Sequence, residues 1–251
     1  MRRMSGQLLQ RKSVLLACLL GILPAMAHAN PDIVETGRLL ATALDAGRVT
    51  IGLNQSLIND PSKGHKGFTP EVFEKQMVAL FQERMGVDLQ DLENPQIPDQ
   101  AKLLLARLIE ESKKTVASYQ AVINLKGIKY KGLIPATFGT ETAKRFQTWS
   151  KVYLKQTAPD HFLRNPKNKA DPFERKMMDT FSNSPEDRQK VFSKTLENEK
   201  IVRVMLPLYY EKSCLSCHGS PKGERDVSGH LKEGGREGQL AGAISVKLPL
   251  P

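Results

Sequence analysis

The sequence is poor in the residues that mark disulfide-held, disordered and fibrous proteins. Its 251 residues include only three cysteines and one tryptophan, and aromatic residues make up 6% of the chain. Three cysteines are too few for a disulfide scaffold, while 40% hydrophobic and 25% charged residues are ordinary for a protein that buries a core. The length fits one large domain, or one domain with a helical extension.

Catalytic motifs of several enzyme classes are also missing. The chain has no Gly-x-Ser-x-Gly sequence, no His-Glu-x-x-His sequence and no phosphate-binding loop. These absences argue against hydrolysis and phosphoryl transfer, and we expect a protein that is not an enzyme. The 37 basic residues outnumber the 27 acidic ones, but they are spread along the chain rather than clustered among stacking aromatics. We therefore expect no nucleic-acid partner.

A long uncharged apolar run occurs only near the start of the chain, over residues 14–27. It follows four basic residues and precedes two alanines that flank His28, the pattern of a secretory signal peptide (residues 1–29) cleaved after Ala29. The run is too short to span a bilayer comfortably, although a retained anchor is the alternative. We expect export by the general secretion route to the periplasm or beyond, with no stable membrane insertion after cleavage.

Cleavage changes both the cysteine count and the charge. Loss of residues 1–29 removes Cys18 and four basic residues, so the formal charge falls from +10 to +6. Two cysteines remain, Cys214 and Cys217. A mildly basic exported protein suits weak electrostatic docking with an acidic redox or signalling protein.

Helical patterns come first in the chain and strand patterns follow. After the signal peptide we divide the chain into an N-terminal helical region, 30–126, and a second domain, 127–251. The clearest helix begins after the capping residue Thr69 and ends before Gly86. Further helices are expected over 99–125, over 140–155 and from Pro172, and strands over 128–138, 201–210 and 240–248. This order predicts an α+β fold in which a helical arm precedes the sheet domain.

One motif carries chemistry, the sequence Cys-Leu-Ser-Cys-His at residues 214–218. Cys-x-x-Cys-His is the attachment motif of c-type haem. Two thiols three positions apart can reach the two vinyl groups on one edge of a porphyrin, and the adjacent imidazole of His218 supplies the proximal bond to iron. This attachment takes place outside the cytoplasm, in agreement with the signal peptide. We expect one covalent haem c held by Cys214 and Cys217.

Three other uses of the two cysteines stay open from the sequence alone. A redox Cys-x-x-Cys pair normally opens a helix in a βαβ setting, which the neighbouring residues do not resemble. A disulfide between residues three apart closes a small loop and gains little from chain entropy. A zinc site needs a fourth ligand, and only the remote His230 is available.

The second axial position of the iron has several candidate ligands. Met77 is the leading one, because a thioether is a known haem ligand and Met77 lies on the apolar stripe of a predicted helix. A methionine at that spacing is also a common core residue. His65, in a turn-rich loop, is a second candidate, whereas His161 is expected beside the sheet and His230 at the haem edge. Water or an open position would leave the iron free to bind a ligand.

A basic turn offers partners for the haem propionates. Arg164, Lys167 and Lys169 lie close together in the sequence, and arginine favours bidentate contact with carboxylates. We predict a contact between Arg164 and a propionate. A solvated basic turn is the alternative.

Three segments together resemble a known family. They are residues 164–174 (RNPKNKADPFE), residues 214–219 (CLSCHG) with Pro221, and residues 235–246 (GREGQLAGAISV) followed by Pro249. This order resembles a bacterial family of exported single-haem c-type domains with a PAS-like fold, long catalogued as a domain of unknown function. Members of that family occur in chemoreceptors and histidine kinases and as stand-alone periplasmic proteins.

The resemblance implies a PAS-like antiparallel sheet with flanking helices, with Cys214 and Cys217 as thioether positions and His218 as the proximal ligand. Some relatives use a cysteine on a helix before the sheet as distal ligand, and no mature cysteine is left here for that role. We expect a periplasmic haem protein that senses redox state or a small gas and acts through a separate partner. The alternative is a monohaem cytochrome that carries electrons. Peroxidase-like activity is not expected, because no distal acid–base pair can be named.

Overall fold

The computed structural model describes residues 31–183 and 190–250, so the signal peptide lies outside the described residues. The helices are α1 (Pro31–Leu53), α2 (Gln55–Ile58), α3 (Pro70–Met85), α4 (Asp99–Ser118), α5 (Gln120–Ile123), α6 (Pro135–Ser150), α7 (Pro172–Asn183) and α8 (Leu215–His218). The strands are β1 (Tyr153–Thr157), β2 (Phe192–Leu196), β3 (Ile201–Tyr209) and β4 (Leu240–Pro249), with short 3-10 turns η1 (Asp160–Phe162), η2 (Pro166–Asn168), η4 (Glu197–Glu199) and η5 (Lys212–Cys214). None of the described helices has the length and apolar character that crossing a membrane requires.

Four antiparallel strands form one sheet, in the order β1-β4-β3-β2. Strands β3 and β4 pair along their length, with Val204 opposite Val246, and β1 pairs with the other edge of β4, with Leu154 opposite the same Val246. Because successive side chains of a strand point to opposite faces, these three apolar residues lie side by side on one face of the sheet.

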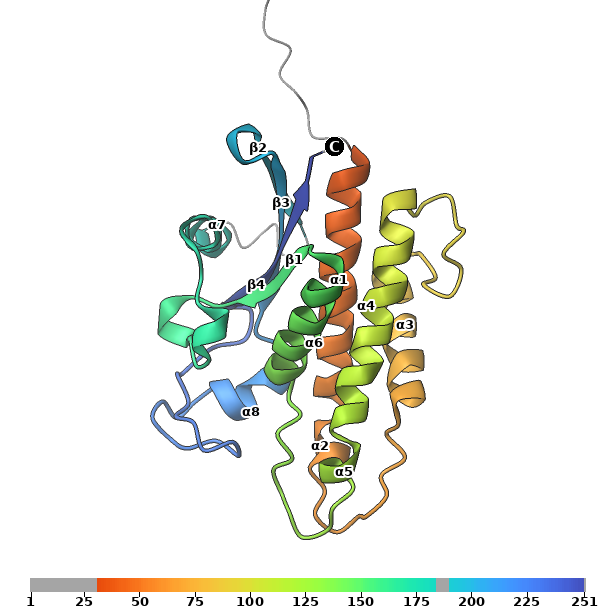
Figure 1. The fold of residues 1–251 in the computed structure, drawn as a ribbon. Coiled ribbons are helices and arrows are strands. Elements are labelled where there is room, and N and C mark those ends of the chain that lie inside the picture. The colour runs from red at the N-terminus through yellow and green to blue at the C-terminus, as the bar shows by residue number, and fades with distance from the viewer. Residues whose placement is uncertain (1–30, 184–189, 251) are drawn as a thin grey trace, which may run out of the picture.

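Helix α1 lies at the centre of the molecule, between the other long helices and the sheet (Figure 1). It packs against α3, α4 and α6 and also against β3 and β4. At Gly37 the helix approaches β3 so closely that a Cβ atom would lie 2.5 Å from Cγ2 of Val204, so a larger residue does not fit. The helices and the sheet therefore share one hydrophobic core, which contains Leu40, Leu105 and Val246.

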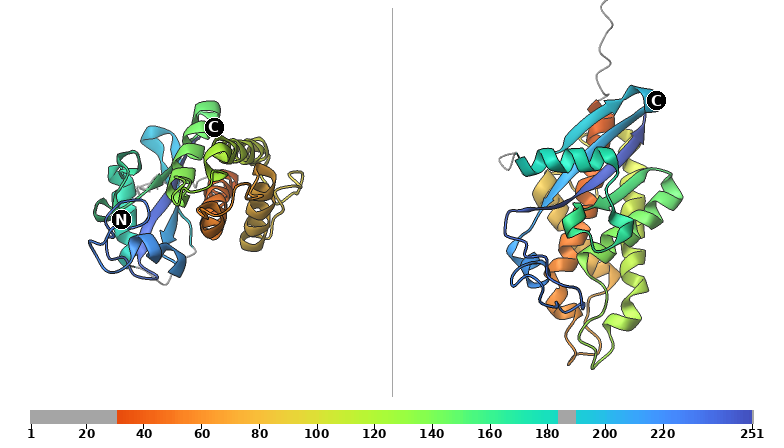
Figure 2. Two further views of the ribbon diagram at one scale, coloured as in Figure 1. Left: turned by 90° about the horizontal axis from the view of Figure 1, so that it is seen from below. Right: turned by 90° about the vertical axis from the view of Figure 1, so that its left-hand side faces the viewer.

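Helix α7 covers the opposite face of the sheet and lies across the strands (Figure 2). Its Met178 and Phe181 pack with Met205 of β3 and Ala243 of β4. The sheet is thus enclosed between α7 on one face and the α1-centred helices on the other.

A buried charged cluster fastens α7 to the sheet. Arg203 of β3 is 3% exposed and donates hydrogen bonds to Asp171 (3.0 Å), Ser245 (3.2 Å) and Glu174 (3.4 Å). The fully buried Glu174 also accepts a hydrogen bond from Lys155 of β1 at 2.9 Å. The start of α7 is thereby tied to β1 and β3, and Arg203 links it further to Ser245 of β4.

The predicted α+β architecture is confirmed, with helices first and then an antiparallel sheet flanked by helices. The capping of α3 is also confirmed: Thr69 Oγ1 accepts a hydrogen bond from the Val72 N–H, and the helix ends at Gly86 with a φ of 68°. The strands predicted over 201–210 and 240–248 are β3 and β4.

Between residues 128 and 155, one predicted element is wrong and another is confirmed over most of its length but ends too late. The predicted strand over 128–138 is a loop followed by the first turn of α6, where Pro135 occupies a position that suits proline. The helix predicted over 140–155 ends at Ser150, and its last residues belong to β1, which is stabilised by pairing with the distant β4. The boundary placed at residue 127 falls in the loop between α5 and α6.

Candidate functional site

The Cys-x-x-Cys-His residues follow directly on the central strand β3. The next residue, Tyr210, donates a backbone hydrogen bond to the carbonyl of Gln239 at 2.9 Å, just before β4 begins. The chain then turns through η5 and α8. Cys214 and Cys217 are free thiols and are partly exposed. The sheet therefore fixes where the motif begins, while the motif itself lies at the molecular surface (Figure 1).

His218 ends α8 and is oriented by a carboxylate. Its Nδ1 atom lies 3.0 Å from Oε2 of Glu233. A carboxylate can only accept, so Nδ1 carries the hydrogen and Nε2 keeps its lone pair. Burial lowers the pKa of His218, and the charge of Arg164 acts in the same direction, against the raising effect of Glu233. The imidazole is therefore held neutral and in a defined tautomer, the form in which histidine binds a metal.

Arg164 connects the residues around the motif. Its guanidinium donates to both carboxylate oxygens of Glu233, with 2.9 Å from Nη2 to Oε2, and to Asp226 at 2.6 Å. The same Nη2 donates to the backbone carbonyl of Cys217 at 2.8 Å. One side chain thus holds the partner of His218, a second carboxylate and the backbone of the motif itself.

The two carboxylates that contact Arg164 are kept ionised. Burial raises the pKa of Glu233, but hydrogen bonds from Arg164 and His218 outweigh it and hold the pKa below its ordinary value. Burial opposes ionisation of Asp226 as well, yet hydrogen bonds from Ser228 and Arg164 lower its pKa to about 2. Glu233 therefore acts as a hydrogen-bond acceptor at neutral pH.

An aromatic contact supports the other side of the imidazole ring. Tyr210 stacks on His218 with ring centroids 5.2 Å apart and an interplanar angle of 27°. A Cβ atom at Gly235 would lie 2.7 Å from the Tyr210 ring, so this contact leaves no room for a larger residue there. Tyr210 in turn contacts Phe162 at 5.3 Å, and Phe162 contacts the exposed ring of His161 at 4.1 Å. A row of rings therefore runs from His218 to the surface.

Met77 and His65, the candidate second ligands, lie elsewhere in the fold. Met77 is fully buried in the hydrophobic core on α3, whose neighbours are α1 and α4. His65 is exposed in the loop between α2 and α3. The structure does not bring Met77 to His218, because the apolar stripe of α3 packs against other helices.

The remaining candidates are near the site but differ in environment. Arg164 is bound to protein carboxylates and carbonyls, and its contact with a propionate stays a prediction. Lys167 and Lys169 are exposed. His230 contacts the Ser228 hydroxyl at 3.0 Å. Across residues 31–183 and 190–250, no three His, Cys, Asp or Glu side chains are arranged to bind a metal ion, so the zinc alternative has no ligand set there.

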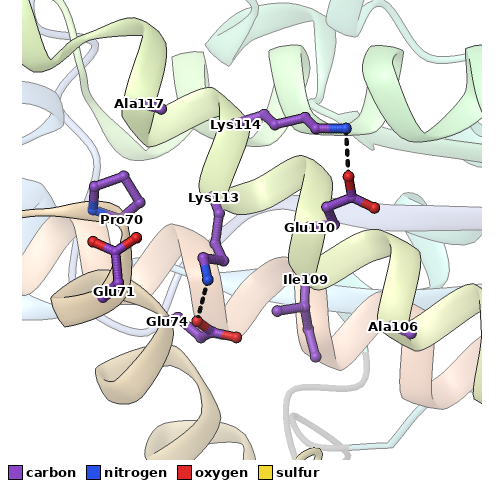
Figure 3. A pocket seen from close by; sticks show the side chains of 9 residues that line it. All are labelled: Pro70, Glu71, Glu74, Ala106, Ile109, Glu110, Lys113, Lys114 and Ala117. Atoms are coloured by element: carbon purple, nitrogen blue, oxygen red, sulfur yellow. Dashed lines mark ion pairs between the residues drawn. The ribbon is translucent and has the colours of Figure 1, made fainter.

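A cleft of about 400 Å³ lies between α3 and α4, away from the motif (Figure 3). Its charged side chains face one another: Lys113 pairs with Glu74 at 2.6 Å, and Lys114 pairs with Glu110 at 2.6 Å. These ion pairs account for four of the five charged side chains that line the cleft, and Glu71 is the fifth. We assign it no role at the site.

The sequence pattern did not identify Glu233, Asp226 or Tyr210 as part of the site. Glu233 follows His218 by 15 residues and Arg164 precedes Glu233 by 69 residues, so only the folded loops bring them together. The one available signal for Tyr210 is its place between the end of a predicted strand and the motif.

Comparison with known proteins identifies the family. Residues 90–249, well over half of the chain, match the model of the Tll0287-like family. The protein belongs to the Tll0287-like family. The matched segment contains Arg164, Glu233 and the Cys-x-x-Cys-His residues, so the site described above lies within the part that defines the Tll0287-like family.

A solved structure is also similar to this chain, the crystal structure of the cyanobacterial heme-protein Tll0287. The two sequences are 18% identical, the TM-score is 0.42, and the match covers 61% of this chain and 96% of that one. No curated protein matches the sequence.

Proposed function

We propose that this protein binds one haem c covalently, through thioether bonds from Cys214 and Cys217, with His218 as the proximal iron ligand. One observation carries the proposal. The hydrogen bond from His218 Nδ1–H to Glu233 leaves Nε2 as the available nitrogen, next to two free thiols. Membership of the Tll0287-like family agrees with this, because Tll0287 is a heme-protein.

The surrounding residues fit this cofactor. Glu233 fixes the tautomer and the orientation of His218, and Arg164 holds both Glu233 and the backbone of Cys217. Tyr210 supports the imidazole ring from one side. When bound, haem supplies an iron atom that changes oxidation state or takes a small diatomic ligand. The chain contributes two attachment points and a neutral, oriented imidazole.

We further propose that the protein senses redox state or a small gas in the periplasm, after loss of residues 1–29. Ligation by Met77 would require α3 to leave the core that it forms with α1 and α4. This favours an iron with an exchangeable position over a methionine-ligated one. An electron-carrying cytochrome is the alternative, favoured by the row of rings from His218 through Tyr210 to the exposed His161.

Covalent attachment is tested on denaturing gels stained for haem. The full chain is produced in a bacterium with a cytochrome c maturation system. We expect the wild type to keep the stain and the double variant Cys214→Ala, Cys217→Ala to lose it. Ser216→Ala, between the two cysteines, is the matched control and should keep it. An unstained wild type, or a stained double variant, contradicts the proposal.

The sensing proposal is tested by visible spectra with and without carbon monoxide. A ferrous protein that binds carbon monoxide readily supports an exchangeable position. A low-spin spectrum that is indifferent to carbon monoxide excludes gas sensing and supports the electron carrier. Met77→Leu keeps the core filled, and we expect its spectrum to equal that of the wild type; loss of a methionine-type spectrum would instead identify Met77 as a ligand.

The proposed compartment is tested by the mass of the product. We expect a periplasmic chain that begins at Asn30. A full-length chain in the membrane fraction would support the retained anchor instead.

A further inference from the structure

Five lysines gather on two loops at one end of the molecule. The first loop, residues 59–69, follows α2, and the second, residues 124–134, follows α5; Figure 1 shows both at the bottom of the view. We call the two loops together the lysine tip. Its lysines are Lys63, Lys66, Lys126, Lys129 and Lys131, and its only acidic residue is Asp60.

Hydrogen bonds join the two loops into one surface. The Lys66 N–H donates to Asn124 Oδ1 at 3.0 Å, and the Lys131 N–H donates to Asn59 Oδ1 at 3.0 Å. The backbone N–H of Gly127 donates to the carbonyl of Pro61 at 2.8 Å. The two loops are therefore held in a fixed arrangement relative to each other.

The positive charge of the lysine tip is largely unneutralised. Lys63 lies 3.9 Å from Asp60. The ammonium groups of the buried Lys66 and Lys131 instead donate to backbone carbonyls, those of Lys63 and Leu125. Carbonyls satisfy hydrogen bonds but carry no compensating charge, and burial together with Lys131 lowers the pKa of Lys66.

Exposed apolar side chains lie among the lysines. Leu125 is 49% exposed and Ile128 is 42% exposed, and both are next to exposed lysines, Lys126 and Lys129. An apolar centre with a charged rim is the usual composition of a transient protein interface.

We propose that the lysine tip is the docking surface for an acidic protein partner. The proposal goes beyond the haem function, because the surface consists of exposed residues outside the haem site: Lys63, Lys126, Lys129, Leu125 and Ile128. The opposite charge of the partner would speed encounter and orient it, and the apolar centre would hold it.

The observations favour a protein over an anionic membrane. Surface-bound membrane proteins anchor themselves with exposed Trp, Phe and Leu on an amphipathic helix. The lysine tip consists of loops, and its aromatic side chains, Phe68 and Tyr130, are buried or half-buried.

The binding test uses an acidic [2Fe–2S] ferredoxin as the probe, oxidised, in titration calorimetry with the full exported protein. The tip variant is Lys126→Glu with Lys129→Glu. The control is Lys176→Glu with Lys194→Glu, which changes the net charge equally on exposed residues of α7 and β2. We expect the tip variant to weaken binding by about tenfold or more and the control by less than about twofold, with both differences shrinking at about 0.15 M salt. Equal weakening in both variants, or wild-type binding no tighter than that of the tip variant, overturns the proposal.

Two further measurements separate the proposal from its alternatives. Sedimentation with vesicles of phosphatidylglycerol and phosphatidylcholine should not depend on the tip lysines; tip-dependent vesicle binding without ferredoxin binding overturns the choice of a protein partner. In the haem-loaded protein, reduced ferredoxin passes one electron to ferric haem and is itself oxidised. The tip variant should slow this second-order reaction and leave reduction by dithionite unchanged. The calorimetric result stands whether or not haem is attached, so failure of the haem proposal is recognised separately by the gel stain.

Discussion

Arg203 and Arg164 each bind a pair of carboxylates, and the two clusters have different surroundings. Arg203 joins Asp171 and Glu174 between β3 and α7, and it is 3% exposed. Arg164 joins Asp226 and Glu233 beside the Cys-x-x-Cys-His residues, and its side chain is 18% exposed. The Arg203 cluster ends on strand residues and on the Phe173 ring, 4.4 Å away. The Arg164 cluster ends on His218 and on the Cys217 carbonyl.

The same chemical pairing thus fastens a helix to the sheet in one place and orients an imidazole in the other. The difference between the two clusters lies in the groups that each contacts beyond its carboxylates. A cluster closed by backbone, rings and lysine can only hold elements together. A cluster that ends on an imidazole with a free nitrogen can also tune what that nitrogen binds.

The largest effect is expected from Arg203→Ala. It leaves Glu174 buried without its arginine, and we expect a loss of about 3–5 kcal/mol in the free energy of unfolding, measured by urea denaturation. Arg175→Ala is the matched control on the same helix. Its partner Asp160 is 3.4 Å away and both side chains are largely exposed, so its loss should stay below about 1 kcal/mol. Equal losses in the two variants would show that the buried cluster contributes no more to stability than an exposed ion pair does.

Arg164→Ala should have a smaller effect on stability and a larger one on the site. We expect a loss of about 1–3 kcal/mol in the free energy of unfolding from the broken charged hydrogen bonds. In the haem-loaded protein we also expect a changed visible spectrum, because Glu233 and the Cys217 backbone lose their common anchor. Arg164→Lys should recover part of the stability but not the spectrum, since lysine lacks the planar fork. If Arg164→Lys recovered both the stability and the spectrum, the positive charge alone would explain the role of Arg164.

Glu233→Gln tests whether the Glu233 carboxylate alters the electron donation of the His218 imidazole. A glutamine accepts the His218 N–H more weakly than a carboxylate does, so the imidazole donates less electron density and ferric iron is less stabilised. We expect the reduction potential of the haem to rise, measured against a reference dye, with less than about 1 kcal/mol lost in stability. Glu237→Gln, an exposed neighbour, is the control. An unchanged potential in Glu233→Gln would restrict Glu233 to a structural role.

The smallest effect is a pH dependence of stability from the Arg203 cluster. Burial raises the pKa values of Asp171 and Glu174, but hydrogen bonds and nearby cations outweigh it and lower both below their ordinary values of 3.8 and 4.5. A lowered pKa in the folded state means that the stabilisation is complete above the unfolded value and is lost as the pH falls through the folded value. We expect urea stability to decline below about pH 4.5, and Glu174→Gln to show a shallower decline over the same range. Parallel curves would contradict this assignment.

The parts of the fold that the sequence predicts are those with local signals. Thr69 and Gly86 bound α3 because capping depends on a few neighbouring residues, and Ile244 and Val246 alternate along β4 on one face. Strand β1 had no such signal, because Tyr153 and its neighbours become a strand only through pairing with β4.

The candidate site divides in the same way. Cys214, Cys217 and His218 could be recognised because they are contiguous, while Arg164 and Glu233 are brought together by the fold from 69 residues apart. Met77 shows the limit of periodicity. Its position in the stripe predicts burial, which is confirmed, but it does not say which surface covers the residue.

The close contact between Gly37 of α1 and Val204 of β3 has a consequence for how the chain can be divided. A fragment that starts at residue 127 would lack α1 and expose the apolar sheet face that this helix covers. The helical region and the sheet therefore gain their stability together and should melt in a single cooperative transition. The Cys-x-x-Cys-His residues follow β3, so their position depends on the packing of α1, a helix far from them in the sequence.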